Sequence, residues 1–174
     1  MLQNTLILMR YKDWLKNLII IIPVIFSNNL KSYELYPNII ICFIVFCLAS
    51  SIIYIINDIK DIKEDKSHSA KIHYKPIANG SISPKLAYFY ILILIFFLTI
   101  LVYNFLFIIL YHIVFYLILN LLYIFKIKEV SYIDILLISL GYILRIDAGS
   151  IIIDVDSTLL ILLCTFILSI FFLS

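Results

Sequence analysis

The chain has 174 residues, of which 64% are hydrophobic and 14% charged, with a mean hydropathy of +1.14 and a formal net charge of +2. Soluble globular domains are about 45–50% apolar and about 25% charged, so this composition excludes an ordinary soluble domain. The small net charge gives no indication of nucleic-acid binding, and we expect an integral membrane protein.

The first predicted element is a membrane helix over about residues 14–30, with Pro23 inside it. A cleaved signal peptide would continue into a site of small residues, whereas NLIIIIPVIFSNNL runs on toward a second apolar segment. We therefore expect this helix to be retained in the protein. Three basic residues precede it or lie at its start: Arg10, Lys12 and Lys16.

Five further membrane helices are expected, because a spanning helix needs ~20 mostly apolar residues. The stretch 86–125 contains no Asp, Glu, Lys or Arg and is long enough for two spans, with a turn expected at Tyr103-Asn104. The fold class is therefore all-α: a polytopic membrane bundle of about six helices in one domain over residues 1–174. The five expected ranges are 37–56, 86–103, 106–125, 132–152 and 158 to the end.

Basic residues are distributed unequally between the two sides of this arrangement. Eleven of the 13 lie on the side of the amino terminus and of the loops 57–85 and 126–131, whereas Lys31 lies on the other side and Arg145 lies within a helix. Because Lys and Arg concentrate in cytoplasmic loops, that side should face the cytoplasm. The many Ile, Phe, Tyr, Lys and Asn residues fit an AT-rich genome, which indicates a bacterial protein. We therefore expect the chain to lie in the bacterial inner membrane.

The segment NDIKDIKED directly follows the second apolar stretch and contains the strongest chemical pattern. Asn57, Asp61 and Asp65 are spaced i, i+4 and i+8, and Asp58 lies three residues before Asp61, so a helix would bring them onto one face. Stacked like charges repel, but a divalent cation among them would reverse that effect, and carboxylate and amide oxygens suit Mg²⁺. The alternative is a solvated loop, neutralised by the neighbouring lysines 60, 63 and 66.

Other polar residues strengthen the interpretation as a site. Arg145 and Asp147 lie within a predicted helix, where an ionisable residue is costly and is a functional candidate by default; the alternative is a structural pairing with another helix. Lysines, an arginine and a tyrosine around a magnesium–carboxylate site would suit a phosphorylated or pyrophosphorylated substrate. The candidate substrate-binding residues are Lys16, Tyr54, Lys71, Lys128 and Arg145.

The histidines and cysteines give no metal-ligand spacing. His112 lies in an apolar helix and is predicted to be a packed residue. The three cysteines lie in apolar runs and are expected to behave as small core residues. The segment KPIANGSIS, with its Pro-x-x-x-Gly spacing, predicts a defined turn.

Several segments of the sequence together resemble a known family. NDIKDIKED resembles the first aspartate-rich motif, NDxxDxxxD, of the UbiA superfamily of intramembrane prenyltransferases, and within it the chain is most similar to the decaprenyl-phosphate phosphoribosyltransferases. Four segments in the same order carry the resemblance: RYKDWLKNLIIIIPVIFS, FCLASSIIYIINDIKD, KPIANGSIS and YIFKIKEVSYIDILLISLGYILRIDAG.

The resemblance implies a reaction and a role for each candidate. Related enzymes move the phosphoribosyl group of phosphoribosyl pyrophosphate onto a polyprenyl phosphate and release pyrophosphate, with a lipid tail lying between helices. By the resemblance, Asn57 and Asp61 would hold Mg²⁺, and Asp58 and Asp65 would support them as catalytic carboxylates together with Asp61. The five candidate substrate-binding residues given above would bind the phosphates of the sugar donor or of the lipid.

The sequence also departs from the family pattern. A run similar to His-Pro-x-Lys-Arg-x-Arg-Pro is replaced by HSAKIHYKP, with Ser69 in place of Pro and Lys75 where Arg is usual. Members of the superfamily have about nine helices, so we expect this chain to be a C-terminally shortened version of that fold. Two other functions stay open: prenyl transfer from a polyprenyl pyrophosphate to an aromatic acceptor, and a small membrane transporter or scaffold.

Overall fold

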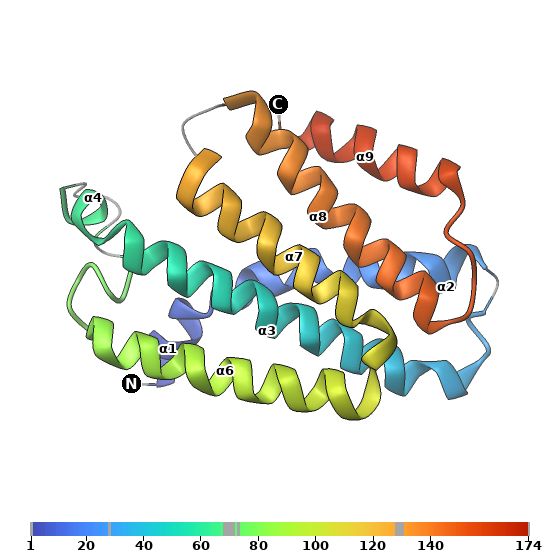
Figure 1. Ribbon diagram of the computed structural model, residues 1–174, viewed down its shortest axis with the longest axis horizontal. Coiled ribbons are helices and arrows are strands. Elements are labelled where there is room, and N and C mark those ends of the chain that lie inside the picture. Colours follow the sequence, from blue (N-terminus) through green and yellow to red (C-terminus); the bar gives the residue numbers. More distant parts are fainter. Residues whose placement is uncertain (1, 28, 68–71, 73, 128–130, 174) are drawn as a thin grey trace. The chain divides into compact units, whose positions relative to one another are not determined.

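The computed structural model describes residues 2–27, 29–67, 72, 74–127 and 131–173, and within these ranges the chain forms helices and no strand (Figure 1). The predicted all-α class is therefore confirmed. The chain divides into two compact units, which are described here one at a time, and the prediction of a single membrane domain stays a prediction. The first unit comprises Met1–Leu15 and Cys47–Ile100, and the second comprises Lys16–Phe46 and Leu101–Ser174.

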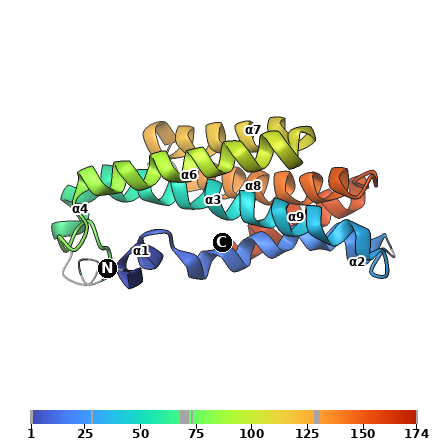
Figure 2. The same cartoon turned by 90° about the horizontal axis from the view of Figure 1, so that it is seen from below.

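The first unit joins α1 (Leu2–Leu8) to the later part of α3 (Tyr36–Lys60), to α4 (Ile62–Ser67) and to most of α6 (Pro84–Phe105). This part of α3 and α6 run side by side in both views (Figure 1, Figure 2). The short helices α1 and α4 lie at one end of the unit (Figure 1, Figure 2).

Hydrogen bonds attach α1 to the helices of its own unit. The hydroxyls of Thr5 and Tyr90, on α1 and α6, lie 3.2 Å apart. Ser51 on α3 donates to the carbonyl of Met9 over 2.9 Å and accepts from Trp14 Nε1 over 3.0 Å. The last carbonyls of a helix have no partner within it, so Ser51 satisfies one where α1 has just ended.

The second unit is built around α8 (Ser131–Ile152). This helix packs against α7, α9 and α2, and Figure 1 shows it between α7 and α9. A buried cluster of Val24, Ile39 and Ile153 forms part of the core. The other helices of the unit are α2 (Ile22–Phe26), η2 (Tyr33–Leu35), η3 (Phe107–Ile109), α7 (Leu110–Leu122), the π-helical η4 (Tyr123–Ile127) and α9 (Leu159–Leu173).

Gly149 allows a close approach between α8 and the chain near Ile20. A Cβ atom at position 149 would lie 2.3 Å from the carbonyl oxygen of Ile20. Small residues at such crossings let helix backbones approach in membrane proteins. The glycine is therefore needed for this packing.

Five of the six predicted ranges correspond to observed helices. The break after α6 is a correction, because it falls at Leu106, whose φ is −135°, and not at Tyr103-Asn104. Both of those residues still belong to α6, since the apolar run offers no glycine or proline to end the helix earlier. The sequence also gave no prediction of the two short helices α1 and α4.

The first predicted helix, over about 14–30, is not one continuous α-helix, and this prediction was wrong. A 3₁₀ helix, η1, covers Tyr11–Ile21, and α2 follows with Pro23 in its first turn. Proline has no N–H and clashes with the carbonyl four residues earlier. It is therefore accommodated at the start of a new helix and not within an older one.

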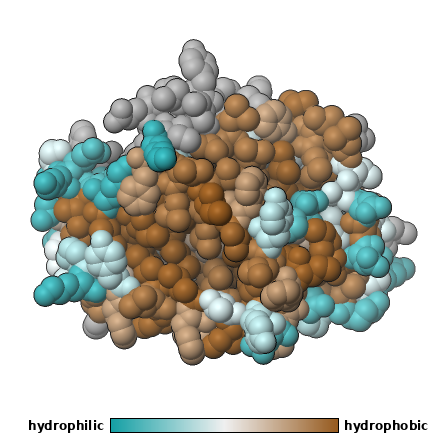
Figure 3. Space-filling view, in the orientation of Figure 1, coloured by the Kyte–Doolittle hydropathy of each residue, from teal (hydrophilic) through white to brown (hydrophobic). Residues whose placement is uncertain are grey.

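Three helical stretches in the described part of the chain are long and apolar enough to cross a membrane: Tyr33–Lys60, Pro84–Phe105 and Phe107–Lys126. Large apolar side chains are exposed along α6, with Leu92 at 65% and Phe96 at 62%. Most side chains on the face drawn in Figure 3 are hydrophobic. Such a surface fits a lipid environment, because water would disfavour an apolar area of this extent.

Candidate active site

The acidic segment lies at the junction of α3 and α4 in the first unit. The helical hydrogen-bond pattern continues through the junction, since Asp61 N bonds to Asn57 O and Asp65 N bonds to Asp61 O, each over 2.9 Å. The spacing of four residues therefore places these three residues one turn apart, as the sequence predicted.

These carboxylates are buried. The exposed fractions are 3% for Asp58, 7% for Asp61 and 2% for Asp65. A solvated loop, the alternative interpretation of the sequence, does not fit this burial. Buried carboxylates require compensation by charges or hydrogen bonds.

Two basic residues from outside the acidic segment supply that compensation. Arg10 Nη2 donates to Asp58 Oδ1 over 2.9 Å, and Lys75 Nζ lies 3.2 Å from the same oxygen and 2.5 Å from Asp65 Oδ2. From the sequence, Arg10 and Lys75 were used only to predict which side of the membrane faces the cytoplasm, and Lys75 also as a departure from the family pattern. The available signal was that they are the first residues of the segments RYKDWLKN and KPIANG, which carry the family resemblance.

The backbone around Lys75 is fixed by the predicted turn, which is confirmed. Asn79 N bonds to Lys75 O over 3.0 Å, and Ile82 N bonds to Pro76 O over 2.9 Å. Gly80 has a φ of +79°, a conformation that favours glycine. Ile77 and Ile82 are buried, so apolar packing and the turn's hydrogen bonds together hold the backbone next to Lys75.

Arg10 occupies an unusual backbone conformation between α1 and η1. Its φ is 51°, which costs energy for a residue with a side chain and is found most often at functional sites. The guanidinium lies 4.6 Å from the ring centroid of Tyr54, close enough for a cation–π interaction. The candidate residue Tyr54 therefore supports the side chain that pairs with Asp58.

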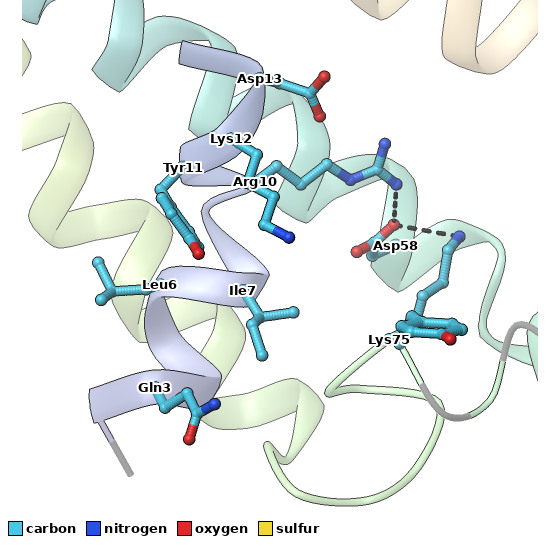
Figure 4. Close-up of a pocket in the computed structure, with 10 residues that line it drawn as sticks. Gln3, Leu6, Ile7, Arg10, Tyr11, Lys12, Asp13, Asp58 and Lys75 are labelled. Atoms are coloured by element: carbon cyan, nitrogen blue, oxygen red, sulfur yellow. Dashed lines mark hydrogen bonds and ion pairs between the residues drawn. The ribbon is translucent and has the colours of Figure 1, made fainter. Parts of the chain in front are cut away.

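A pocket of about 540 Å³ opens beside these groups (Figure 4). Figure 4 shows Arg10 and Lys75 pointing toward Asp58 from different segments of the chain. The walls combine charged side chains with apolar ones from α1. The lining residues are Gln3, Leu6, Ile7, Arg10, Tyr11, Lys12, Asp13, Asp58, Tyr74 and Lys75.

The donor set fits a divalent cation in its chemistry. Carboxylate and amide oxygens are hard ligands, and one ammonium group already lies between the carboxylates of Asp58 and Asp65. Asn57 Nδ2 donates to Asp61 Oδ2 over 3.1 Å. In the described residues no three His, Cys, Asp or Glu side chains are arranged to hold a metal together, so binding would require these side chains to turn.

The second unit contains a different polar cluster, centred on Arg145. The side chain is buried, with 8% exposed. It donates to Asn17 Oδ1 over 2.7 Å, to Gly141 O over 2.7 Å and to Tyr116 OH over 2.9 Å. The guanidinium also lies 4.7 Å from the ring centroid of Tyr116.

Asp147 has its own partners in this unit. Its Oδ2 lies 2.9 Å from His112 Nε2, and its Oδ1 accepts from Ser157 over 2.6 Å. His112 is buried, as the sequence predicted. The structural pairing weighed as an alternative therefore describes Asp147 well, because its contacts join α8 to α7 and to the loop before α9.

The remaining candidates are Lys16, Lys71 and Lys128. Lys16 belongs to the second unit and is exposed on η1. Lys71 and Lys128 lie outside the described residues. The first unit thus brings together Tyr54 and the acidic segment, and the second contains Lys16 and Arg145.

A model described as the UbiA prenyltransferase family matches residues 19–174. The decaprenyl-phosphate phosphoribosyltransferase of Mycolicibacterium smegmatis is 28% identical over 150 residues, which cover 84% of this chain and 47% of that protein. The protein of the same name from Corynebacterium glutamicum is 30% identical, over 82% of this chain and 44% of its own length. That of Mycobacterium tuberculosis H37Rv is 27% identical, over 82% and 48%.

The chain therefore spans about half the length of the curated relatives that it matches. The resemblance expected from the four ordered segments is confirmed. The helical membrane character expected from composition agrees with the family match.

Proposed function

The chain belongs to the UbiA prenyltransferase family, and on this premise we propose that it transfers a phosphoribosyl group from phosphoribosyl pyrophosphate to a polyprenyl phosphate, releasing pyrophosphate. The names of the three relatives support this choice of substrates. The reaction depends on a divalent cation, which we propose to be Mg²⁺. The cation supplies positive charge that stabilises the departing diphosphate.

One observation carries the proposal: three buried carboxylates of an NDxxDxxxD motif lie one turn apart beside a pocket that also presents Arg10 and Lys75. Burying acids and bases together is costly unless they are paired. Asp58, Arg10 and Lys75 line the pocket wall, which makes them available to a charged ligand. A transporter or scaffold would not require this combination.

The metal-binding residues in this proposal are Asn57 and Asp61, with Asp58 and Asp65 as supporting carboxylates. Their oxygens match the ligand preference of Mg²⁺, which commonly shares its shell with substrate phosphates. Tyr54 acts through Arg10, which lies against its ring. The other proposed substrate-binding residues are Lys16, Lys71, Lys128 and Arg145.

In the proposed reaction the bond between ribose C1 and the diphosphate oxygen breaks while an oxygen of the lipid phosphate bonds to C1. The lipid phosphate is already anionic and needs little activation. The protein's contribution is to hold the two anions close together and to offset charge on the leaving group, which stabilises the transition state. Arg10 and Lys75 form ion pairs with Asp58 and Asp65 and are basic residues available for this role in the first unit's pocket.

We propose that the acidic segment faces the cytoplasm of a bacterium, at the inner membrane. The proposal rests on the unequal distribution of Lys and Arg along the sequence. Cysteine accessibility tests it directly. A cysteine introduced at exposed Lys63 should react with a membrane-impermeant maleimide only in inverted membrane vesicles.

The function is tested with membranes that contain the protein, radiolabelled phosphoribosyl pyrophosphate and decaprenyl phosphate. Label should appear in the lipid extract, and chelation of divalent cations should remove it. Added Mg²⁺ should restore the product.

Two results would overturn the proposal. If label stays in the aqueous phase while a prenyl pyrophosphate and 4-hydroxybenzoate yield a prenylated product, the chain is an aromatic prenyltransferase. If neither product forms under conditions in which a full-length relative yields its lipid product, the enzymatic assignment fails. The full-length relative is the positive control, because the present chain covers about half of such proteins.

A further inference from the structure

Two buried acids and two bases form a charge-balanced group in the first unit. Asp58 Oδ1 accepts a hydrogen bond from Arg10 and forms an ion pair with Lys75, which donates to Asp65. The dashed lines in Figure 4 mark the two contacts to Asp58. The formal charges of these four side chains cancel, so the group is satisfied as it stands.

The bases are more exposed than the acids. The exposed fractions of the side chains are 32% for Arg10 and 18% for Lys75, against 3% for each of Asp58 and Asp65. The carboxylates therefore lie deeper, and the basic ends are closer to the solvent. Long side chains with exposed stems can turn without moving the backbone of α3.

A divalent cation bound at Asn57 and Asp61, with Asp58 and Asp65 supporting it, would disturb this balance. It would add two positive charges where Arg10 and Lys75 already satisfy the acids, and like charges at such distances repel strongly. The bases would then be displaced toward the pocket. Lys12 and Asp13, which also line that pocket, contribute one charge of each sign and do not alter the sum.

We propose that Arg10 and Lys75 are exchangeable counter-ions, which hold Asp58 and Asp65 when no metal is bound and turn to the diphosphate when the metal arrives. This inference rests on the proposed function, which supplies the cation and the diphosphate. It predicts that the bases oppose binding of a metal alone and favour binding of a metal with its diphosphate. The two ligands are then coupled, and each strengthens the binding of the other.

The test compares the wild-type chain with Lys75→Gln, both purified in detergent. Mn²⁺ serves as the probe, and its binding is measured by electron paramagnetic resonance, first alone and then as a preformed complex with inorganic pyrophosphate. Lys75→Gln should bind Mn²⁺ alone at least about fivefold more tightly, and should bind the Mn²⁺–pyrophosphate complex at least about fivefold more weakly. Opposite signs from one substitution are the signature of exchange.

Lys66→Gln is the matched control. It removes the same charge from an exposed position on α4 and should leave both affinities within about twofold of wild type. A melting curve reports whether Lys75→Gln folds. If it does not, Arg10→Gln is the second variant, and it should change the two affinities in the same opposite directions.

The outcomes separate the inference from the proposed function. If the substitution leaves both affinities unchanged, or shifts both in the same direction, exchange is wrong while the metal site stands. If wild-type protein binds neither Mn²⁺ nor its pyrophosphate complex, the proposed function loses its metal site and the inference fails with it.

Discussion

The two units both bury polar side chains among apolar helices, but they satisfy those side chains differently. In the first unit, acids are paired with bases beside a pocket, and the basic ends are partly exposed. In the second unit, the hydrogen-bond partners of Arg145 among the described residues are neutral: an amide, a carbonyl and a phenol.

The two clusters differ in how easily their side chains can exchange one interaction partner for another. A paired acid and base can change partners when another charge arrives, because the new charge replaces the lost one. A guanidinium held by three neutral acceptors from three segments loses packing and hydrogen bonds together if it moves. We therefore expect substitutions in the first unit to change ligand binding and activity most, and substitutions at Arg145, a proposed substrate-binding residue, to change stability as well.

The largest effect is expected for Asp61→Asn. Loss of a group that only supports a metal ligand typically costs about 10–100-fold, so loss of a ligating carboxylate should lower turnover in the lipid-product assay at least ~100-fold. The melting temperature in detergent should change little, because Asn retains the shape and can still contact Asn57. Unchanged turnover would remove Asp61 from the site and weaken the contrast between the units.

Arg145→Met should destabilise the protein by about 2–4 kcal/mol, since Asn17 and Tyr116 each lose a buried partner. Thermal unfolding in detergent measures this change. Arg145→Lys provides the comparison, because it keeps the charge but cannot reach three acceptors in a fork. Recovery of stability by lysine would show that charge and not hydrogen-bond geometry matters here, and would contradict the contrast drawn above.

Gly149→Ala tests packing in the second unit without altering any polar group. The added methyl would meet the Ile20 carbonyl at 2.3 Å, and overpacking of this kind costs about 1–3 kcal/mol. Gly141→Ala on the same helix is the control, since its nearest neighbour is the side chain of Arg145 at 3.3 Å. Equal melting temperatures for the two variants would mean that α8 tolerates a wider separation.

The smallest effect is expected for Ser157→Ala. It removes one hydrogen bond to Asp147, a residue that also contacts His112, and should cost about 1 kcal/mol. Activity should stay within about twofold of wild type, since neither residue is among the proposed metal-binding or substrate-binding residues. A large loss of activity with unchanged stability would assign Asp147 a functional role that its contacts do not suggest.

The sequence predicted most helices because long apolar runs admit few alternatives. Residues 36–60 and 84–105 were predicted to within a few residues, and the turn after Pro76 followed from its glycine. The first segment was wrongly predicted to be one continuous α-helix, because hydropathy does not distinguish a 3₁₀ helix from an α-helix. Pro23 was visible, but its position in the first turn of α2 required the structure.

The acidic part of the site was predictable because its spacing matches the helical repeat. The bases that pair with it were not, since Arg10 and Lys75 lie 48 and 17 residues from Asp58 and no local periodicity connects them. Only tertiary folding brings them together. Similarly, His112 was predicted to be packed, but its carboxylate partner lies 35 residues away.

The conformation of η1 affects how much of a bilayer a short segment can cross. Each residue of a 3₁₀ helix advances about 2.0 Å, compared with about 1.5 Å in an α-helix. About 15 such residues would match the ~30 Å of hydrocarbon for which an α-helix needs about 20. Windows calibrated on α-helical rise will therefore underestimate the length of a 3₁₀ segment such as Tyr11–Ile21.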